Sequence, residues 1–233
     1  MSARKSSVIV GGSSGIGFAV AAALAGRGEA VVLTSRHAGR AEAAARKIGG
    51  DAVGLAFDLA EPHAIAGKLA GVGSVDHLVI PAIERDRNSV KDYDVARAIR
   101  LATIKLVGYV EAIHALLPRL TADASVVLFG GQARERPYPG STTVTAGNGA
   151  VTTMVRTLTL EIAPIRVNAI HPGLVGDSPA WAGNAAAIDR ARSQSPGGRI
   201  PTTADCVAAT LFLLDTASMN GANLVIDAGW GLV

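Results

Sequence analysis

The chain has 233 residues, of which 49% are hydrophobic, and its formal net charge at pH 7 is +3. This length suits one domain with a sizeable core, so we expect a single domain spanning 1–233. The near balance of 22 basic and 19 acidic residues argues against a nucleic-acid partner. The single cysteine, Cys206, excludes an internal disulfide, and no apolar run suits a signal peptide or a membrane span. We therefore expect a cytoplasmic protein.

The N-terminal stretch carries the strongest local pattern. A short apolar run at 7–10 precedes a glycine-rich turn at 11–17, an alanine-rich run at 18–25 and a second apolar run at 30–33. The order strand, turn, helix, strand is typical of a parallel α/β sheet that binds a dinucleotide. Glycines let the backbone approach a pyrophosphate, and the helix N-terminus supplies amide donors. The residues of this turn predicted to bind the cofactor are Gly11, Ser13, Ser14, Gly15, Ile16 and Gly17.

The end of the second apolar run indicates which dinucleotide binds. An acidic side chain here would bond a ribose 2′-hydroxyl, but the chain reads Thr34-Ser35-Arg36. The guanidinium of Arg36 suits a 2′-phosphate, because it offers two charge-assisted hydrogen bonds, and the Ser35 hydroxyl can add a third. NADP(H) is therefore favoured over NAD(H). The alternative is that Arg36 is an ordinary solvated arginine.

Strand and helix patterns alternate along the rest of the chain. Further strands are predicted at 52–57, 77–80, 125–129, 166–170 and 223–226, and helices at 38–48, 62–70, 142–163 and 203–214. The segment 90–117 is predicted as two helices or one bent helix. The segments 130–141 and 174–199 are predicted as loops, the second one polar and mobile. This order predicts a Rossmann-like, doubly wound parallel sheet of about seven strands with helices on both faces, which binds its ligand at the carboxyl ends of the strands.

These motifs, together with 163–173 and the tail at 221–229, resemble the short-chain dehydrogenase/reductase family over essentially the whole chain. The resemblance implies a nicotinamide cofactor, a small-molecule substrate and a homodimer or homotetramer. It further implies that Asp58 and Leu59 follow the third strand beside the adenine. It places Pro81 and Ala82 in the signature after the fourth strand, and Pro172 and Gly173 against the nicotinamide.

The family's catalytic residues do not match this chain. The tyrosine position reads Val144, the lysine position Asn148, the asparagine position Lys105, and the serine position Gly130 or Gly131. The usual mechanism therefore does not transfer, because valine cannot shuttle a proton.

Three other residues are candidates for catalysis. Compared with the family pattern, lysine and asparagine look exchanged, because Lys105 stands at the asparagine position and Asn148 at the lysine position. We therefore interpret Lys105 and Asn148 as candidate catalytic residues. Tyr138 is the tyrosine nearest to the position that Val144 fills. For two of them there is a plainer structural interpretation: a solvated or interface lysine for Lys105 and loop packing for Tyr138.

Three functions follow from this pattern. The favoured one is an atypical NADP(H)-dependent oxidoreductase acting on a small organic substrate, such as an activated alkene or imine, whose reduction demands little acid catalysis. The second is a non-catalytic NADP(H)-binding regulatory or structural subunit. The third is a non-redox enzyme on the same fold, an isomerase, lyase or cyclase. No spacing typical of metal ligands occurs, so no metal is expected.

Overall fold

In the computed structural model, which describes residues 4–233, all strands pair in parallel in one seven-stranded sheet of order β3-β2-β1-β4-β5-β6-β7. Residues 1–3 of the predicted domain lie outside the described residues. The strands are β1 (Ser6–Ile9), β2 (Ala30–Ser35), β3 (Val53–Ala56), β4 (Val75–Ile80), β5 (Leu120–Phe129), β6 (Arg166–Pro172) and β7 (Asn223–Ile226). This arrangement confirms the predicted doubly wound fold.

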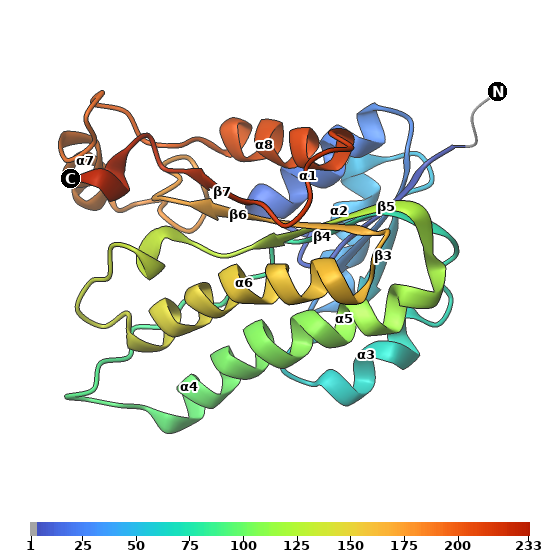
Figure 1. Ribbon diagram of the computed structural model, residues 1–233, viewed down its shortest axis with the longest axis horizontal. Coiled ribbons are helices and arrows are strands. Elements are labelled where there is room, and N and C mark those ends of the chain that lie inside the picture. Colours follow the sequence, from blue (N-terminus) through green and yellow to red (C-terminus); the bar gives the residue numbers. More distant parts are fainter. Residues whose placement is uncertain (1–3) are drawn as a thin grey trace.

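Helices cover both faces of the sheet. They are α1 (Gly15–Gly26), α2 (Ala38–Ile48), α3 (Pro62–Leu69), α4 (Val95–Ala102), α5 (Tyr109–Leu116), α6 (Thr142–Glu161), α7 (Ala185–Ser193) and α8 (Thr203–Asp215). Figure 1 shows α3, α4, α5 and α6 on one face and α1 and α8 on the other. Short 3-10 turns lie at Leu117–Arg119, Gln132–Arg134 and Trp230–Leu232.

Each face of the sheet has its own core because successive strand residues point to opposite sides. In β4, Leu78 and Ile80 belong to the cluster under α3, α5 and α6, whereas Val79 belongs to the cluster under α1, α2 and α8. The carboxyl ends of the strands meet at one edge of the sheet. The loops after β4, β5 and β6 gather there, at the left of Figure 1. The topology thus places the predicted ligand-binding residues at one edge.

Several predicted boundaries were wrong. The predicted helix 90–117 begins only at Val95, where the Asp94 carboxylate accepts a hydrogen bond from the backbone N–H of Arg97, a regular N-cap. A π-helical turn, Thr103–Gly108, joins α4 to α5. The strand predicted to start at 125 starts at Leu120. The predicted loop 174–199 contains the helix α7, which begins in an alanine run.

The continuous helical stretch Val95–Arg119 is the one place in the described chain where length and composition alone would permit a membrane span. Of its most apolar window, 44% is buried in the protein. Its buried side chains, among them Ile104, Tyr109 and Ile113, belong to the core under the sheet. A core helix of this kind passes the same test of length and hydropathy, so the stretch is weak support for a membrane protein.

Candidate cofactor and catalytic site

The glycine-rich turn after β1 is tightly folded and leaves helix amides free. A Cβ on Gly17 would lie 2.2 Å from the carbonyl oxygen of Gly11, and a Cβ on Gly11 would lie 2.9 Å from the Cα of Ala82. Side chains at these two positions would therefore push the turn away from the loop after β4. Ser14 is the N-cap residue of α1 and makes no side-chain cap hydrogen bond. The first-turn amides of α1, which start at Gly15, thus suit an anion such as a pyrophosphate.

Four charged side chains connect the carboxyl ends of β2, β3 and β4 with α4. Arg36 Nη1 lies 2.9 Å from Glu84 Oε2, Arg100 Nε lies 2.8 Å from Glu84 Oε1, and Arg100 Nη2 lies 2.8 Å from Asp58 Oδ2. The two residues predicted to hold the adenosine end, Arg36 and Asp58, therefore belong to one ion-pair chain. Glu84 and Arg100 were not identified from the sequence.

The ion pairs affect the protonation of this cluster. Burial raises the pKa of Asp58, but hydrogen bonds from the Ala60 amide and from Arg100 outweigh burial and hold the pKa below its usual range. The hydrogen bonds that Arg100 donates to Glu84 and Asp58 raise the pKa of its guanidinium. Asp58 and Arg100 are thus charged at neutral pH. Beside them, Ser35 and Leu59 are buried, and the Ser35 hydroxyl accepts a long 3.5 Å hydrogen bond from the His37 amide.

The ends of β4 and β6 form the side of the edge where the family resemblance places the nicotinamide. Pro172 ends β6, and the Gly173 amide donates to the carbonyl of Ile226, which ties this corner to β7. A Cβ on Gly173 would lie 3.0 Å from the Cβ of Asp227, so the backbone is close-packed here. Pro81 and Ala82 lie against the glycine turn.

Lys105 is buried where β4, β5 and the π-helical turn meet. Its Nζ donates to the carbonyl oxygen of Phe129, the last residue of β5, and to the hydroxyl of Tyr109, both at 2.7 Å. The Tyr109 hydroxyl donates in turn to the carbonyl oxygen of Ala82 at 2.6 Å. Because burial disfavours the ammonium form, it lowers the pKa of Lys105 to about 7. The lysine thus joins two strand ends and can exchange a proton near neutral pH.

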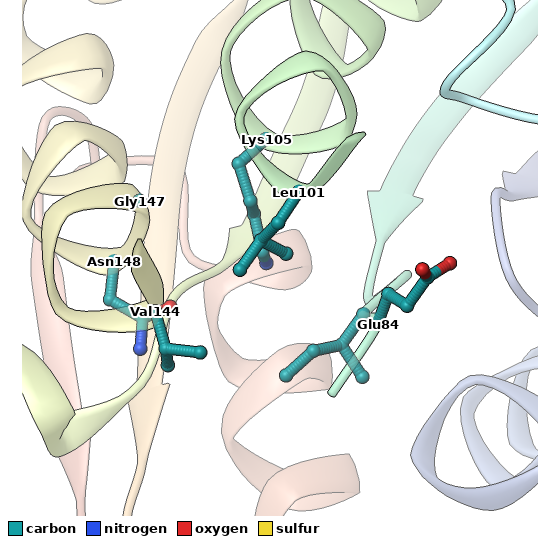
Figure 2. A pocket seen from close by; sticks show the side chains of 7 residues that line it. Glu84, Leu101, Lys105, Val144, Gly147 and Asn148 are labelled. Carbon is teal, nitrogen blue, oxygen red and sulfur yellow. The ribbon is translucent and has the colours of Figure 1, made fainter. Parts of the chain in front are cut away.

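Asn148 and Val144 lie one turn apart on α6 and share a small pocket with Lys105 (Figure 2). Gly147 of α6 lies next to the π-helical turn that carries Lys105, and a Cβ on Gly147 would lie 3.5 Å from the Lys105 Cγ. A Cβ on Gly131 would lie 2.9 Å from the Asn148 Nδ2, so the loop after β5 packs on the amide. The structure thus brings Lys105 and Asn148 to one pocket.

Tyr138 lies at the rim of this edge rather than in the pocket of Lys105. It is half-exposed in the loop after β5. Burial lowers the pKa of the Arg85 guanidinium, and the nearby Tyr138 partly offsets this effect. The Arg85 guanidinium stacks on the ring of Trp181 at 4.2 Å, which links the loops after β4 and β6. Pro179, which is also in the loop after β6, lies near Gly15 at the start of α1. The segment after β6 thus reaches both walls of the candidate site.

His171 lies behind the loop after β5 and is fully buried. Its Nε2 is 2.8 Å from the Asn223 Oδ1, and burial lowers its pKa to about 4. The imidazole is therefore neutral at pH 7 and is a structural group rather than an acid. Among residues 4–233, no cluster of three or more His, Cys, Asp or Glu side chains could hold a metal ion.

Comparison with known proteins gives a consistent result. Residues 10–231 match the family described as enoyl-(acyl carrier protein) reductase. The chain is 30% identical to the 3-oxoacyl-[acyl-carrier-protein] reductase of Bos taurus over 230 residues, which cover 95% of both chains. It is 29% identical to the short-chain dehydrogenase/reductase malC of Malbranchea aurantiaca, over 97% of this chain and 94% of malC.

A solved structure titled MalC reductase/Diels-Alderase, also from Malbranchea aurantiaca, superposes with a TM-score of 0.90. The superposition covers 99% of this chain and 96% of the other, at 26% identity.

Proposed function

Because this chain belongs to the short-chain dehydrogenase/reductase family, we propose that it is an NADP(H)-dependent oxidoreductase with a divergent catalytic site. The family assignment covers the fold, the nicotinamide cofactor and a small-molecule substrate. The preference for NADP(H), the role of each residue and a cytoplasmic location are our proposals. The observation that carries the divergent mechanism is the pocket shared by Lys105, Val144 and Asn148.

Residues at the carboxyl edge of the sheet would hold the cofactor. The amides that begin at Gly15 would bind the pyrophosphate, Asp58 the adenine, and Arg36 a 2′-phosphate. Arg36 supports NADP(H) because it occupies the end of β2, where an acidic residue would favour NAD(H). The bound cofactor supplies a hydride, and Pro172 and Gly173 would lie against its reactive ring.

The chain's own residues then need to position the substrate and supply one proton. Val144 has no ionisable group, so the proton must come from another group. Lys105 is suited to this role because its amine is buried at the end of β5 and titrates near pH 7. Asn148 would orient the substrate or the ribose through its amide, and Tyr138 offers a phenol from the rim. A proton delivered from Lys105 would be regained from solvent after each turnover.

The substrate we favour is a double bond activated by conjugation or charge. An enoyl group, named in the description of the matched family, is an alkene activated by a carbonyl. Hydride addition to such an alkene, or to an iminium, does not generate an alkoxide, so no acid is needed to protonate one. A site without a tyrosine acid tolerates this reaction better than the reduction of an ordinary ketone.

The first test is a fluorescence titration with NADPH and NADH, followed by a screen of enoyl thioesters, imines and ketones for NADPH oxidation. We expect NADPH to bind with micromolar affinity and Arg36→Ala to weaken it about tenfold, since one charged hydrogen-bonding group to phosphate is lost. Arg40→Ala, a nearby exposed arginine, is the matched control. Equal affinity of Arg36→Ala and the wild type for NADPH would refute the 2′-phosphate role.

A second candidate is a non-redox enzyme such as a cyclase, which the similarity to a protein titled reductase/Diels-Alderase favours. Product formation without a change in absorbance at 340 nm would support it. A third candidate is a non-catalytic NADP(H)-binding subunit. Cofactor binding without turnover, together with a co-purifying partner, would support that reading.

A further inference from the structure

Glu84 is the centre of the ion-pair chain at the adenosine end. Both of its carboxylate oxygens lie within 3.0 Å of Arg100 Nε, and Oε2 also lies 2.9 Å from Arg36 Nη1. Glu84 lies in the loop after β4, whereas Arg36 directly follows β2, so their contact closes the edge of the sheet between these strands. The side chain of Glu84 is only 31% exposed. Arg36 therefore already has an anionic partner from its own chain.

The charges of this cluster cancel. Arg36 and Arg100 carry two positive charges, and Glu84 and Asp58 carry two negative charges, held within one chain of contacts. A 2′-phosphate brought to Arg36 would meet the Glu84 carboxylate beside it, and two anions at one guanidinium repel. A ribose 2′-hydroxyl has no such conflict, because it can donate to the same carboxylate.

We propose that Glu84 is an internal competitor for the 2′-phosphate subsite at Arg36 and so weakens the preference of this protein for NADP(H). This inference rests on the proposed NADP(H) site and extends it to a residue outside the glycine turn. Binding of NADPH requires Glu84 to leave Arg36, and Arg100 then holds the carboxylate alone. Binding of NADH leaves the Arg36–Glu84 pair intact. The Glu84 carboxylate therefore reduces the difference between the affinities for NADPH and NADH that Arg36 alone would create.

The test isolates the adenosine end by using fragments without nicotinamide. Adenosine 2′,5′-bisphosphate and 5′-AMP are titrated calorimetrically into the wild type and Glu84→Gln. We expect Glu84→Gln to bind the 2′,5′-bisphosphate about tenfold more tightly, with less than a threefold change for 5′-AMP, because the repelling charge is removed. Glu84→Asp, which withdraws the carboxylate from Arg36 by one methylene, should give a smaller gain.

Two controls separate this effect from a change in net charge or folding. Glu161→Gln removes an exposed carboxylate from the far end of α6 and should leave both affinities unchanged. In the double variant Arg36→Met/Glu84→Gln the gain should disappear, because the gain requires Arg36. Thermal melting of each variant shows whether it is folded.

The inference is overturned if both Glu84→Gln and Glu84→Asp, folded, bind the 2′,5′-bisphosphate no more tightly than the wild type. It is also overturned if the gain persists without Arg36. Failure of the proposed oxidoreductase activity gives a different result: the fragment affinities would change as expected, but no substrate would oxidise NADPH.

Discussion

Lys105 is enclosed by protein: only 2% of the residue is exposed, and its ammonium lies against a carbonyl, a hydroxyl and the ring of Tyr109. No carboxylate pairs with it in these contacts, so burial of its charge is compensated only by neutral hydrogen-bond acceptors and by the ring. The neutral amine is correspondingly favoured in the folded state. This imbalance makes the stability of the protein depend on pH.

The sign of that dependence follows from the two states. In the unfolded chain a lysine keeps its proton up to about pH 10.4, whereas the pKa of Lys105 in the fold is about 7. The unfolded state thus binds more protons between these values, and stability rises with pH in that window. We expect the free energy of unfolding to gain about 2 kcal/mol from Lys105 between pH 7 and 9. Urea unfolding at pH 7, 8 and 9 measures it.

Lys105→Met should abolish this rise, whereas Lys68→Met, which replaces an exposed lysine of α3, should keep it. Tyr109 acts in the opposite direction at higher pH: burial raises its pKa, so its contribution to stability falls above pH 10. The measurements therefore stop at pH 9. A wild-type stability that is flat or falls between pH 7 and 9, with Lys105→Met identical to it, would contradict the assignment.

Three residues near the candidate site were found only in the structure: Tyr109, Glu84 and Arg100. Tyr109 follows Lys105 by four residues, a helical spacing that was visible but carries no chemical signature on its own. Glu84 and Arg100 meet through an irregular loop, and no periodicity predicts that contact. The residues of the glycine turn were predicted because their backbone positions follow directly from the strand order, whereas Asp58 was predicted from the family resemblance.

At the scale of elements, glycines allow helices to approach the chain that carries Asp58. A Cβ on Gly108, in the π-helical turn, would lie 2.3 Å from the carbonyl oxygen of Leu59. The helix therefore touches the backbone directly after Asp58. A Cβ on Gly67 in α3 would meet nothing within 4 Å. Substitution by alanine should therefore have opposite effects on stability at these two helical glycines.

Gly108→Ala should destabilise the protein by about 3 kcal/mol, because Leu59 or the helix must move. Gly67→Ala should stabilise it by about 0.5 to 1 kcal/mol, since alanine restricts the unfolded chain and favours the helix. Urea unfolding of both variants beside the wild type measures the difference. Equal shifts in the two variants would show that the close packing of Gly108 on Leu59 contributes nothing.

The errors in the predicted elements have specific physical causes. Apolar residues between 90 and 95 imitate helical spacing, but the Asp94 cap fixes the true start of α4. The residues from Leu120 to Ala124 alternate in polarity, but alanine and aspartate are depleted in strands, so the first half of β5 was missed, although it pairs with β4 at Val75. The helix α7 was hidden among glycine and serine residues that are typical of loops.

At the scale of the whole molecule, the sheet and its helices could be predicted because one pattern repeats along the chain. Short apolar runs alternate with helical runs, and such connections are right-handed and parallel. The order of the strands then brings the loops after β1, β2, β3, β4 and β6 to one edge (Figure 1). The repeated pattern does not predict how the loops pack over that edge, for example the stacking of Arg85 on Trp181.

The outer face of α4, the π-helical turn and α5 presents exposed apolar side chains. They belong to Val95, Ile99, Leu106, Val107 and Val110. Ile99 is 62% exposed and Val107 is 50% exposed, and several of these side chains follow one another at helical spacing. A contiguous apolar stripe of this kind is typical of an interface between protein chains. Together with the oligomers implied by the family resemblance, this stripe supports a homodimer or homotetramer.

We expect the protein to sediment as a dimer or tetramer at micromolar concentration. The double variant Ile99→Glu/Val107→Glu should raise the dissociation constant about a hundredfold, because each copy would bury two unpaired carboxylates in the interface. Val53→Glu, on the edge strand β3 away from these helices, is the matched control and should leave the assembly intact. Sedimentation velocity across a concentration series measures both. A monomeric wild type, or a double variant that assembles as tightly as the wild type, would refute the role of this face.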